Sequence, residues 1–148
     1  MLRQFMFGGL ISVCNIMIHA LIMTAVVRAS QMAAAKAATR PNFLLTAVMA
    51  VTASVLMVAH GCEIVVWSLA YGIVDVVPDN AAHLYFAFVN YTTLGYGDIV
   101  PNERWRLLGP MTAMNGVLLF GWSTAVIFEV LRKTMNRHSA GSYFDPTR

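Results

Sequence analysis

The most constraining feature of this chain is the stretch at residues 92–98, which reads Thr-Thr-Leu-Gly-Tyr-Gly-Asp. Gly95 and Gly97 are separated by one residue, and glycine readily adopts the positive-φ conformations that a side chain disfavours. Successive carbonyl oxygens can then point the same way, whereas in an ordinary strand they alternate. A row of carbonyl oxygens on one side of the backbone is suited to binding a cation that has lost its water.

The composition of the chain indicates a membrane protein. Of its 148 residues, 58% are hydrophobic and only 11% are charged, which is too apolar for an ordinary soluble domain. The 10 basic residues form no dense run, so we expect no nucleic-acid partner. No motif pairs a nucleophile with a base, so we expect no enzyme activity and no cofactor. The four histidines and two cysteines do not cluster in sequence, so we predict no metal-ligand spacing.

Three apolar segments, residues 5–27, 43–74 and 103–134, reach the roughly 20 residues that a helix needs to cross a bilayer. A fourth segment, residues 80–91, is too short to cross and leads directly into residues 92–98. Such a re-entrant helix is tolerated only where protein or a water-filled cavity surrounds it. We therefore predict an all-α membrane protein. The first segment either spans the bilayer or lies in its interface, because a cleaved signal peptide fits its length and polar residues poorly.

Residues 92–98 resemble the selectivity filter of bacterial-type tetrameric potassium channels, whose usual form is Thr-Val-Gly-Tyr-Gly followed by Asp. The only departure is Leu94 in place of valine. The resemblance covers residues 43–135 and implies an outer helix at 43–74, a pore helix at 80–91, the filter at 92–98 and an inner helix at 103–134. Residues 1–42 then form an extra N-terminal helix with a basic connection, and residues 136–148 form a short cytoplasmic tail.

The resemblance implies a potassium-selective channel subunit that forms a homotetramer in the lipid bilayer with three further copies of itself, because one chain supplies only one side of the ion's shell. It assigns potassium coordination to residues of the filter and the external mouth to Asp98. The coordinating residues are Thr93, Leu94, Gly95, Tyr96 and Gly97. Relatives place tryptophan or glutamate behind the filter, but Phe86 and Val89 stand there in this chain and neither can hydrogen-bond to Asp98. The filter is therefore braced weakly, or by Asn90 or Tyr85.

The inner helix carries the residues that the resemblance associates with the pore and its gate. Gly116 and Gly121 are candidate hinges, although small residues at helix crossings also act as packing notches. One helical face is predicted to line the pore, and it collects Val117, Phe120, Thr124 and Phe128. Pro110 predicts a kink. Glu129 either surrounds the inner mouth or pairs with Arg132 or Lys133.

Four polar residues inside the first two apolar segments share helical faces. Asn15 and His19 are four residues apart, and His60 and Glu63 are three apart. Titratable groups at membrane depth are functional candidates, so His19, His60 and Glu63 suggest gating by protonation. The alternative is that Glu63 pairs with His19 or His60 and only orients the packing.

The charges predict the orientation. Basic residues follow the first segment, without acids nearby, and further basic residues end the last segment. This pattern places both regions in the cytoplasm and the filter outside. These residues are Arg28, Lys36, Arg40, Arg132, Lys133 and Arg137. We expect the bacterial inner membrane, with Trp67 and Tyr71 in an outer aromatic belt. Asp79 or Asn80 is expected to cap the pore helix, and Asn102 the inner helix.

Two other functions stay open at this point. A weakly selective cation channel would share the architecture, and a non-conducting membrane scaffold could retain the motif. A potassium-uptake transporter fits poorly, because such proteins generally carry several pore repeats and this chain carries one. No helix has arginine at every third position, so a standard voltage sensor is not expected, and the sequence does not indicate the gating stimulus.

Overall fold

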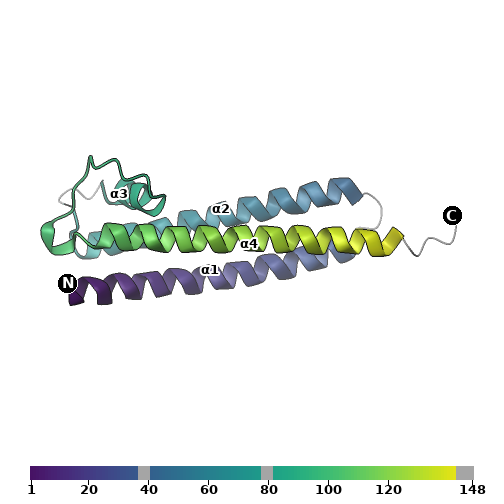
Figure 1. Cartoon of the computed structure of the whole chain (residues 1–148), viewed down its shortest axis with the longest axis horizontal. Coiled ribbons are helices and arrows are strands. Elements are labelled where there is room, and N and C mark those ends of the chain that lie inside the picture. Colours follow the sequence, from purple (N-terminus) through teal and green to yellow (C-terminus); the bar gives the residue numbers. More distant parts are fainter. Residues whose placement is uncertain (37–40, 78–81, 143–148) are drawn as a thin grey trace.

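Three long helices lie side by side, and a short helix packs at one end of them (Figure 1). The computed structural model describes residues 1–36, 41–77 and 82–142, with side chains for 1–32, 45–77 and 82–136. The α-helices of this part of the chain are α1 (Leu2–Lys36), α2 (Pro41–Ile73), α3 (Ala82–Tyr91) and α4 (Leu108–Ser142). A 3-10 turn, η1 (Glu103–Trp105), precedes α4.

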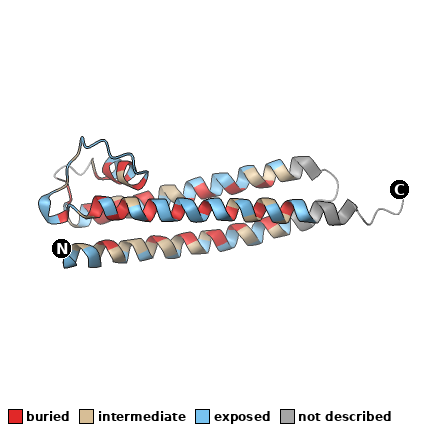
Figure 2. Ribbon diagram, in the orientation of Figure 1, coloured by how far each residue is buried: buried red, intermediate tan, exposed pale blue. Residues whose placement is uncertain are grey.

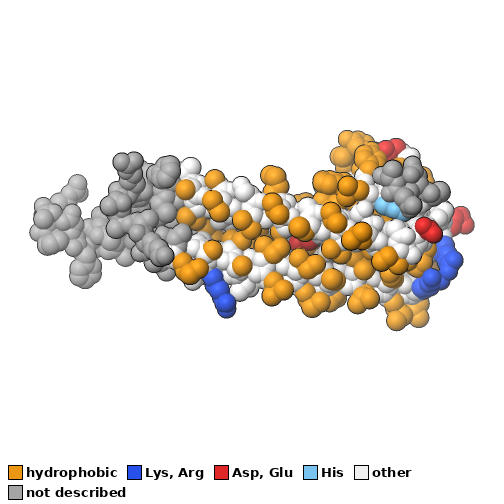
Figure 3. Space-filling view, turned by 180° about the vertical axis from the view of Figure 1, so that it is seen from behind, with side chains coloured by type: hydrophobic (Ala, Val, Ile, Leu, Met, Phe, Trp, Pro, Cys, Tyr) orange, Lys and Arg blue, Asp and Glu red, His pale blue; other side chains and the backbone are white. Residues whose placement is uncertain are grey.

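The long helices have the length and composition of membrane spans. The candidate spans are Leu2–Met32, Leu45–Ile73 and Glu103–Asn136. The side of the bundle seen in Figure 3 is largely apolar along its length, and acidic and basic side chains gather near α3. The exposed face of α1 carries Met6, Leu10, Val13, Met17 and Leu21, which follow the helical spacing of a lipid-facing stripe. The chain is thus an all-α membrane protein, as the sequence predicts.

Buried residues recur along each of the three long helices (Figure 2). One apolar cluster lies at the end that holds α3 and includes Trp67, Tyr71 and Tyr91. A second lies toward the opposite end and includes Leu56 and Val130. The buried polar side chains Glu63 and His19 come from helix positions between the two clusters. The bundle therefore has two apolar cores with a polar layer between them.

The predicted aromatic belt is wrong for Trp67 and Tyr71, because both side chains are fully buried. The Trp67 indole nitrogen donates to Asn115 Oδ1 at 3.0 Å. The Tyr71 hydroxyl bonds to the hydroxyl of Thr112. These two polar partners on α4 satisfy the polar ends of the rings inside the core, so the aromatic residues join helices to each other instead of anchoring them to lipid headgroups.

Several predicted helix ends also need correction. The inner helix begins at Leu108 rather than 103, so Pro110 lies in its first turn. The N–H groups of a first turn have no partner within the helix, so proline loses no hydrogen bond there and the predicted kink is not expected. The Asn102 side chain makes no capping bond to η1. Its Nδ2 donates to the Asp75 carbonyl at 2.9 Å. The predicted caps at Asp79 and Asn80 lie outside the described residues.

The end of α2 is tied to the segment that returns from the filter. Asp75 adopts a left-handed conformation, with φ of 49°, and the Val76 amide reaches back to the Tyr71 carbonyl at 3.1 Å. This is a Schellman-type helix end. The Asn102 amide then donates to the Val76 carbonyl at 2.9 Å. The return segment is therefore held by the backbone of the α2 terminus.

The beginning of α1 is anchored at the same end of the bundle. Gln4 Oε1 accepts the amide of Leu107 at 2.9 Å, just before α4 begins. The Arg3 guanidinium lies 4.8 Å from the centre of the Trp105 ring, and Phe7 packs on that ring at 5.8 Å. Along its length α1 packs against both α2 and α4. The first predicted segment is therefore an integral helix of the bundle.

Among the glycines of the described residues, Gly116 has the least space for a side chain. A Cβ atom built at Gly116 would lie 2.1 Å from the carbonyl oxygen of Tyr91, at the end of α3. At Gly121, five residues along the same helix, a Cβ would meet nothing within 4 Å. The geometry supports the packing interpretation of Gly116, because α4 can approach α3 this closely only where the side chain is missing.

We expect Gly116→Ala to destabilise the protein by about 1–3 kcal/mol, since the new methyl group must push α3 away from α4. Gly121→Ala is the matched control, because it makes the same change in helix propensity without the clash. Thermal unfolding of the detergent-solubilised protein measures both. Equal stability of the two variants would contradict the packing role.

Candidate functional site

The residues predicted to form the filter follow directly from the C-terminal end of α3. His83, Phe86, Ala87, Val89 and Tyr91 are buried on this helix, which packs against α2 and α4. With only ten residues, α3 is too short to cross a bilayer. The partial negative charge of a helix C-terminus is thereby directed toward the start of the filter.

The backbone of the filter alternates in handedness. Thr93, Gly95 and Gly97 have φ angles of 61°, 56° and 76°, whereas the intervening Leu94 and Tyr96 do not have positive φ. Glycine adopts such angles without strain, but threonine does not, so Thr93 is a strained position. Alternation of this kind brings successive carbonyl groups to one side of the chain. The structure thus gives the two glycines the conformations that the sequence predicts.

Three amide groups at the start of the filter donate to carbonyl groups near the end of α3. The Thr93 amide donates to the Asn90 carbonyl at 2.9 Å, and those of Leu94 and Gly95 donate to the Val89 carbonyl at 2.9 and 3.3 Å. Within the described residues, the carbonyl oxygens of residues 93–97 accept no hydrogen bond. Residues 92–98 are all exposed in the single chain. The segment therefore offers unused acceptors on an accessible surface.

Asp98 at the end of the filter is held by Tyr85. The Tyr85 hydroxyl donates to Asp98 Oδ2 at 2.6 Å, and the Ile99 amide donates to Oδ1 at 3.1 Å. This hydrogen bond and the nearby carboxylate raise the pKa of the Tyr85 hydroxyl above its usual value of 10.0. Of the two braces that the sequence suggests, Tyr85 supplies the bond to Asp98.

Behind the filter lies a cavity of about 220 Å³, bounded by α3, the filter, the return segment and the start of α4. Val89 and Phe86 line it from α3, and Gly95 and Asp98 line it from the filter. The Asn90 amide nitrogen bonds to the Phe86 carbonyl at 2.7 Å rather than to the filter. The Asn90 side chain therefore fixes its own helix, and the side-chain brace of the filter is the bond from Tyr85 to Asp98.

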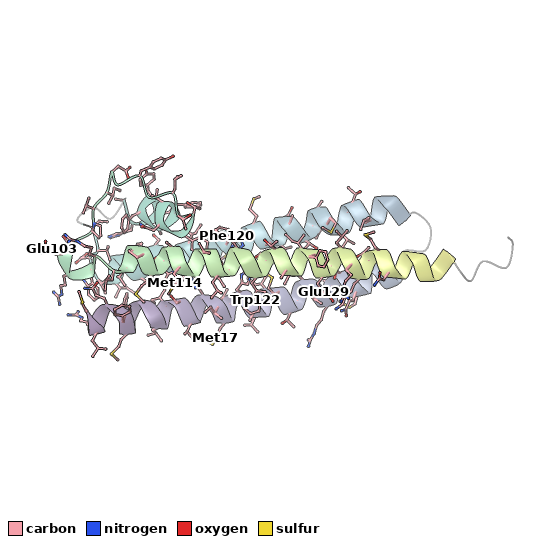
Figure 4. All side chains as sticks on the ribbon, in the orientation of Figure 1. Met17, Glu103, Met114, Phe120, Trp122 and Glu129 are labelled. Atoms are coloured by element: carbon pink, nitrogen blue, oxygen red, sulfur yellow. The ribbon has the colours of Figure 1, made fainter. Side chains whose placement is uncertain are left out.

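The predicted pore-lining residues share an exposed face of α4. Val117 is 58% exposed and Phe128 is 64% exposed. Thr124 is exposed, with its hydroxyl bonded to the carbonyl of Phe120. Phe120 differs from the others, because its ring lies 5.4 Å from that of Tyr91 and 4.5 Å from that of His60. Figure 4 shows Phe120 on the side of α4 that faces α3, whereas Trp122 lies on the side facing α1.

Glu129 is paired within its own helix. Its carboxylate lies 2.8 Å from the Arg132 guanidinium and 3.0 Å from the Lys133 ammonium. Of the two interpretations of Glu129, the structure favours the ion pair. Exposed pairs of this spacing contribute only about 0.3–0.5 kcal/mol, so the pair is not a major determinant of stability.

The titratable residues of the first two helices meet in the polar layer. His19 Nδ1 lies 2.7 Å from Glu63 Oε1, and His60 Nδ1 lies 3.0 Å from Glu63 Oε2. Tyr91 donates its hydroxyl to the same carboxylate. Glu63 thus pairs with both histidines, where the sequence suggested one or the other. The sequence shows no metal-ligand spacing, but the fold brings ligand atoms of His19, His60 and Glu63 within 4.8 Å of one another.

Sequence reasoning missed three polar residues around this layer. Ser123 lies between the two histidines, at 3.0 Å from His60 Nε2 and 3.3 Å from His19 Nε2. Asn115 Oδ1 accepts bonds from Trp67 and, at 3.3 Å, from Asn15. Tyr91 joins the layer to the filter. Asn115 and Ser123 could have been found from the sequence, because polar residues within an apolar segment indicate a face that packs against protein.

Comparison with protein families gives one match, to a family described as ion channel, over residues 45–133. The match spans more than half of the chain. The chain belongs to the ion channel family. Comparison with curated proteins and with solved structures gives no match. The match includes the channel's α3, its filter and most of α2 and α4, whereas α1 lies outside it.

We expect Asp98→Asn to lower the pH at which the channel's Tyr85 ionises, because the negative charge that favours the protonated hydroxyl is removed. Nuclear magnetic resonance of ring-labelled tyrosine, assigned with Tyr85→Phe, measures the titration. Glu103→Gln is the control, since it removes a carboxylate that pairs with Arg106. An unchanged Tyr85 titration in Asp98→Asn would show that the bond is absent in the membrane.

Proposed function

We propose that the protein is the subunit of a potassium-selective channel that conducts K⁺ passively through a central pore. The observation that carries this proposal is the filter backbone. The signs of its φ angles alternate, and its carbonyl oxygens at residues 93–97 accept no hydrogen bond from the described residues. Carbonyl oxygens in such a row can replace the hydration shell of K⁺. The carbonyl groups of Thr93, Leu94, Gly95 and Tyr96, with the Thr93 hydroxyl, supply these ligands.

The working unit in this proposal is a homotetramer. One filter segment offers oxygens from one side only, so the remaining ligands come from three further copies around an axis. Exposure in the single chain supports this arrangement, because Tyr96 is 67% exposed and Leu94 is 55% exposed. The exposed face of α4 that carries Val117 and Phe128 then borders the pore below the filter. Asp98 lies at the external mouth.

The proposed orientation places the filter outside a bacterial inner membrane. The C-terminal ends of α1 and α4 lie opposite α3 (Figure 1). Arg28 lies toward that end of α1, with Lys36 and Arg40 after it in sequence. Arg132 and Lys133 lie toward that end of α4, with Arg137 after them. An end rich in lysine and arginine faces the cytoplasm. The filter end carries fewer basic residues, namely Arg3, Arg104 and Arg106, and the rule counts lysine and arginine rather than net charge.

The decisive test of selectivity is Gly95→Ala, assayed as K⁺ and Na⁺ flux from reconstituted liposomes. Gly95 has φ of 56°, so alanine is strained there whatever space surrounds it. The strain is roughly 1–2 kcal/mol per subunit. We expect the wild type to favour K⁺ strongly and Gly95→Ala to lose that preference.

Gly9→Ala provides the matched control, because Gly9 lies in α1 with nothing within 4 Å and no positive φ. It should leave selectivity unchanged. Flux that still favours K⁺ in Gly95→Ala would contradict the filter assignment. Similar K⁺ and Na⁺ fluxes in the wild type would identify a weakly selective cation channel. No flux from a correctly folded protein would identify a non-conducting scaffold.

We also expect the purified protein to be a tetramer. Native mass spectrometry from detergent or nanodiscs should give four times the 16.2 kDa mass of one chain. The physical reason is that the filter carbonyl groups accept no hydrogen bond from the described part of the chain, and that the α4 face with Val117 and Phe128 is exposed there. A monomer or dimer under conditions that preserve flux would contradict the proposed pore.

A further inference from the structure

Four side chains in the polar layer form a closed ring of contacts. Glu63 joins the two histidines through their Nδ1 atoms, at 2.7 Å for His19 and 3.0 Å for His60. Ser123 Oγ joins the same histidines through their Nε2 atoms, at 3.3 Å and 3.0 Å. The ring connects α1, α2 and α4. Glu63 and His19 are fully buried, and the His60 side chain is 12% exposed.

With neutral histidines and an ionised Glu63, the four groups carry one hydrogen too few to form all four hydrogen bonds of the ring. Each of the four contacts needs one hydrogen between its two atoms. The Ser123 hydroxyl supplies one and each neutral imidazole supplies one, which makes three. An ionised carboxylate supplies none. One added proton completes the ring, with one imidazole donating from both nitrogens.

The same proton balances the charge of the layer. Among the described residues, the titratable groups that face the ring are His19 from α1, His60 and Glu63 from α2, and Tyr91 from α3. On the α4 side the facing groups, Ser123 and Trp122, are neutral. An ionised Glu63 with one imidazolium has no net charge, whereas an unbalanced carboxylate at this depth is costly.

Three groups lie against the Glu63 carboxylate and can favour its ionised form. The Tyr91 hydroxyl donates to it, and the Nδ1 atoms of His19 and His60 donate to it in the tautomers that carry a hydrogen on Nδ1. Hydrogen bonds donated to a carboxylate stabilise its charge. The added proton therefore belongs to the pair of imidazoles and not to the carboxyl group.

We propose that His19, His60, Glu63 and Ser123 bind a single proton, shared by the two histidines, and that Tyr91 couples this proton to the filter. Tyr91 is the last residue of α3, directly before the filter, and its carbonyl oxygen lies against Gly116. Its hydroxyl also lies 2.9 Å from His60 Nδ1. The coupling rests on the proposed potassium function, whereas proton binding does not.

A divalent metal ion fits the same residues less well. With neutral histidines and an ionised Glu63, such an ion would leave one net positive charge in the layer, which an apolar bilayer disfavours. It would also replace the hydrogens that the 2.7 Å and 3.0 Å contacts contain. Zinc binding is therefore an outcome of the test and not the proposal.

The proton is counted by nuclear magnetic resonance of isotope-labelled histidine in the full chain in nanodiscs. At neutral pH we expect one imidazolium in total over His19 and His60. Glu63→Gln should weaken proton binding about tenfold or more, because the balancing charge is lost. His83 is an internal control, since its Nε2 faces the Val77 carbonyl at 3.1 Å outside the ring, and its signals should not change.

The wild-type spectrum tests the count even if a variant does not fold. Two neutral or two charged imidazoles at neutral pH would overturn the proposal. Titration of the pair that is unchanged in Glu63→Gln would overturn it as well. So would stoichiometric binding of added Zn²⁺ that removes the proton and is lost in His19→Gln.

The coupling is tested by K⁺ flux across the range of about pH 5 to 8, where histidines change charge, and above it. We expect wild-type flux to fall as the pH rises and the ring releases its proton. Tyr91→Phe removes the hydroxyl and keeps the ring, so its flux should lose most of this pH dependence while its histidines still titrate. Unchanged pH dependence in Tyr91→Phe would overturn the coupling. Absence of flux at every pH would refute the potassium function and leave the proton count standing.

Discussion

The contact between the Tyr91 carbonyl and the backbone of Gly116 is the interaction on which the filter depends. It joins the end of α3 to the first third of α4 at a distance that no side chain permits. The carbonyl groups of Val89 and Asn90, just before it, hold the filter amides. A backbone without regular secondary structure can lie at membrane depth only when its polar groups have partners or line a water-filled path. The close packing at Gly116 supplies this condition on one side of the filter.

The polar residues of the long helices serve packing in the same way. Within a bilayer, helices gain little from apolar contact with one another, because lipid is equally apolar. Hydrogen bonds such as that from Trp67 to Asn115, and from Asn15 to the same side chain, therefore help to fix which faces of α1, α2 and α4 meet. Once these faces meet, the apolar side chains on either side of the polar layer pack into the two clusters.

The architecture could be predicted from local sequence, because hydropathy and helix length determine what crosses a bilayer. The conformation of Gly95 and Gly97 was also predictable, since few other backbones use that spacing. The partners of Glu63 could not be fixed, because periodicity gives the face of each helix but not the rotation of one helix against another. For the same reason Trp67 and Tyr71 were predicted to lie at the lipid headgroups, although they hydrogen-bond to Asn115 and Thr112 inside the protein.

The position of α1 has a consequence for modularity. The match to the ion channel family covers residues 45–133 and leaves α1 out. Yet α1 covers Glu63 through His19, and its Asn15 bonds to Asn115. Without α1, the Glu63 carboxylate would lose its contact with His19, and the Asn115 side chain would lose its bond from Asn15. In this protein the region shared with the family is therefore completed by a helix outside the match, and the boundaries of the match are not those of the packed bundle.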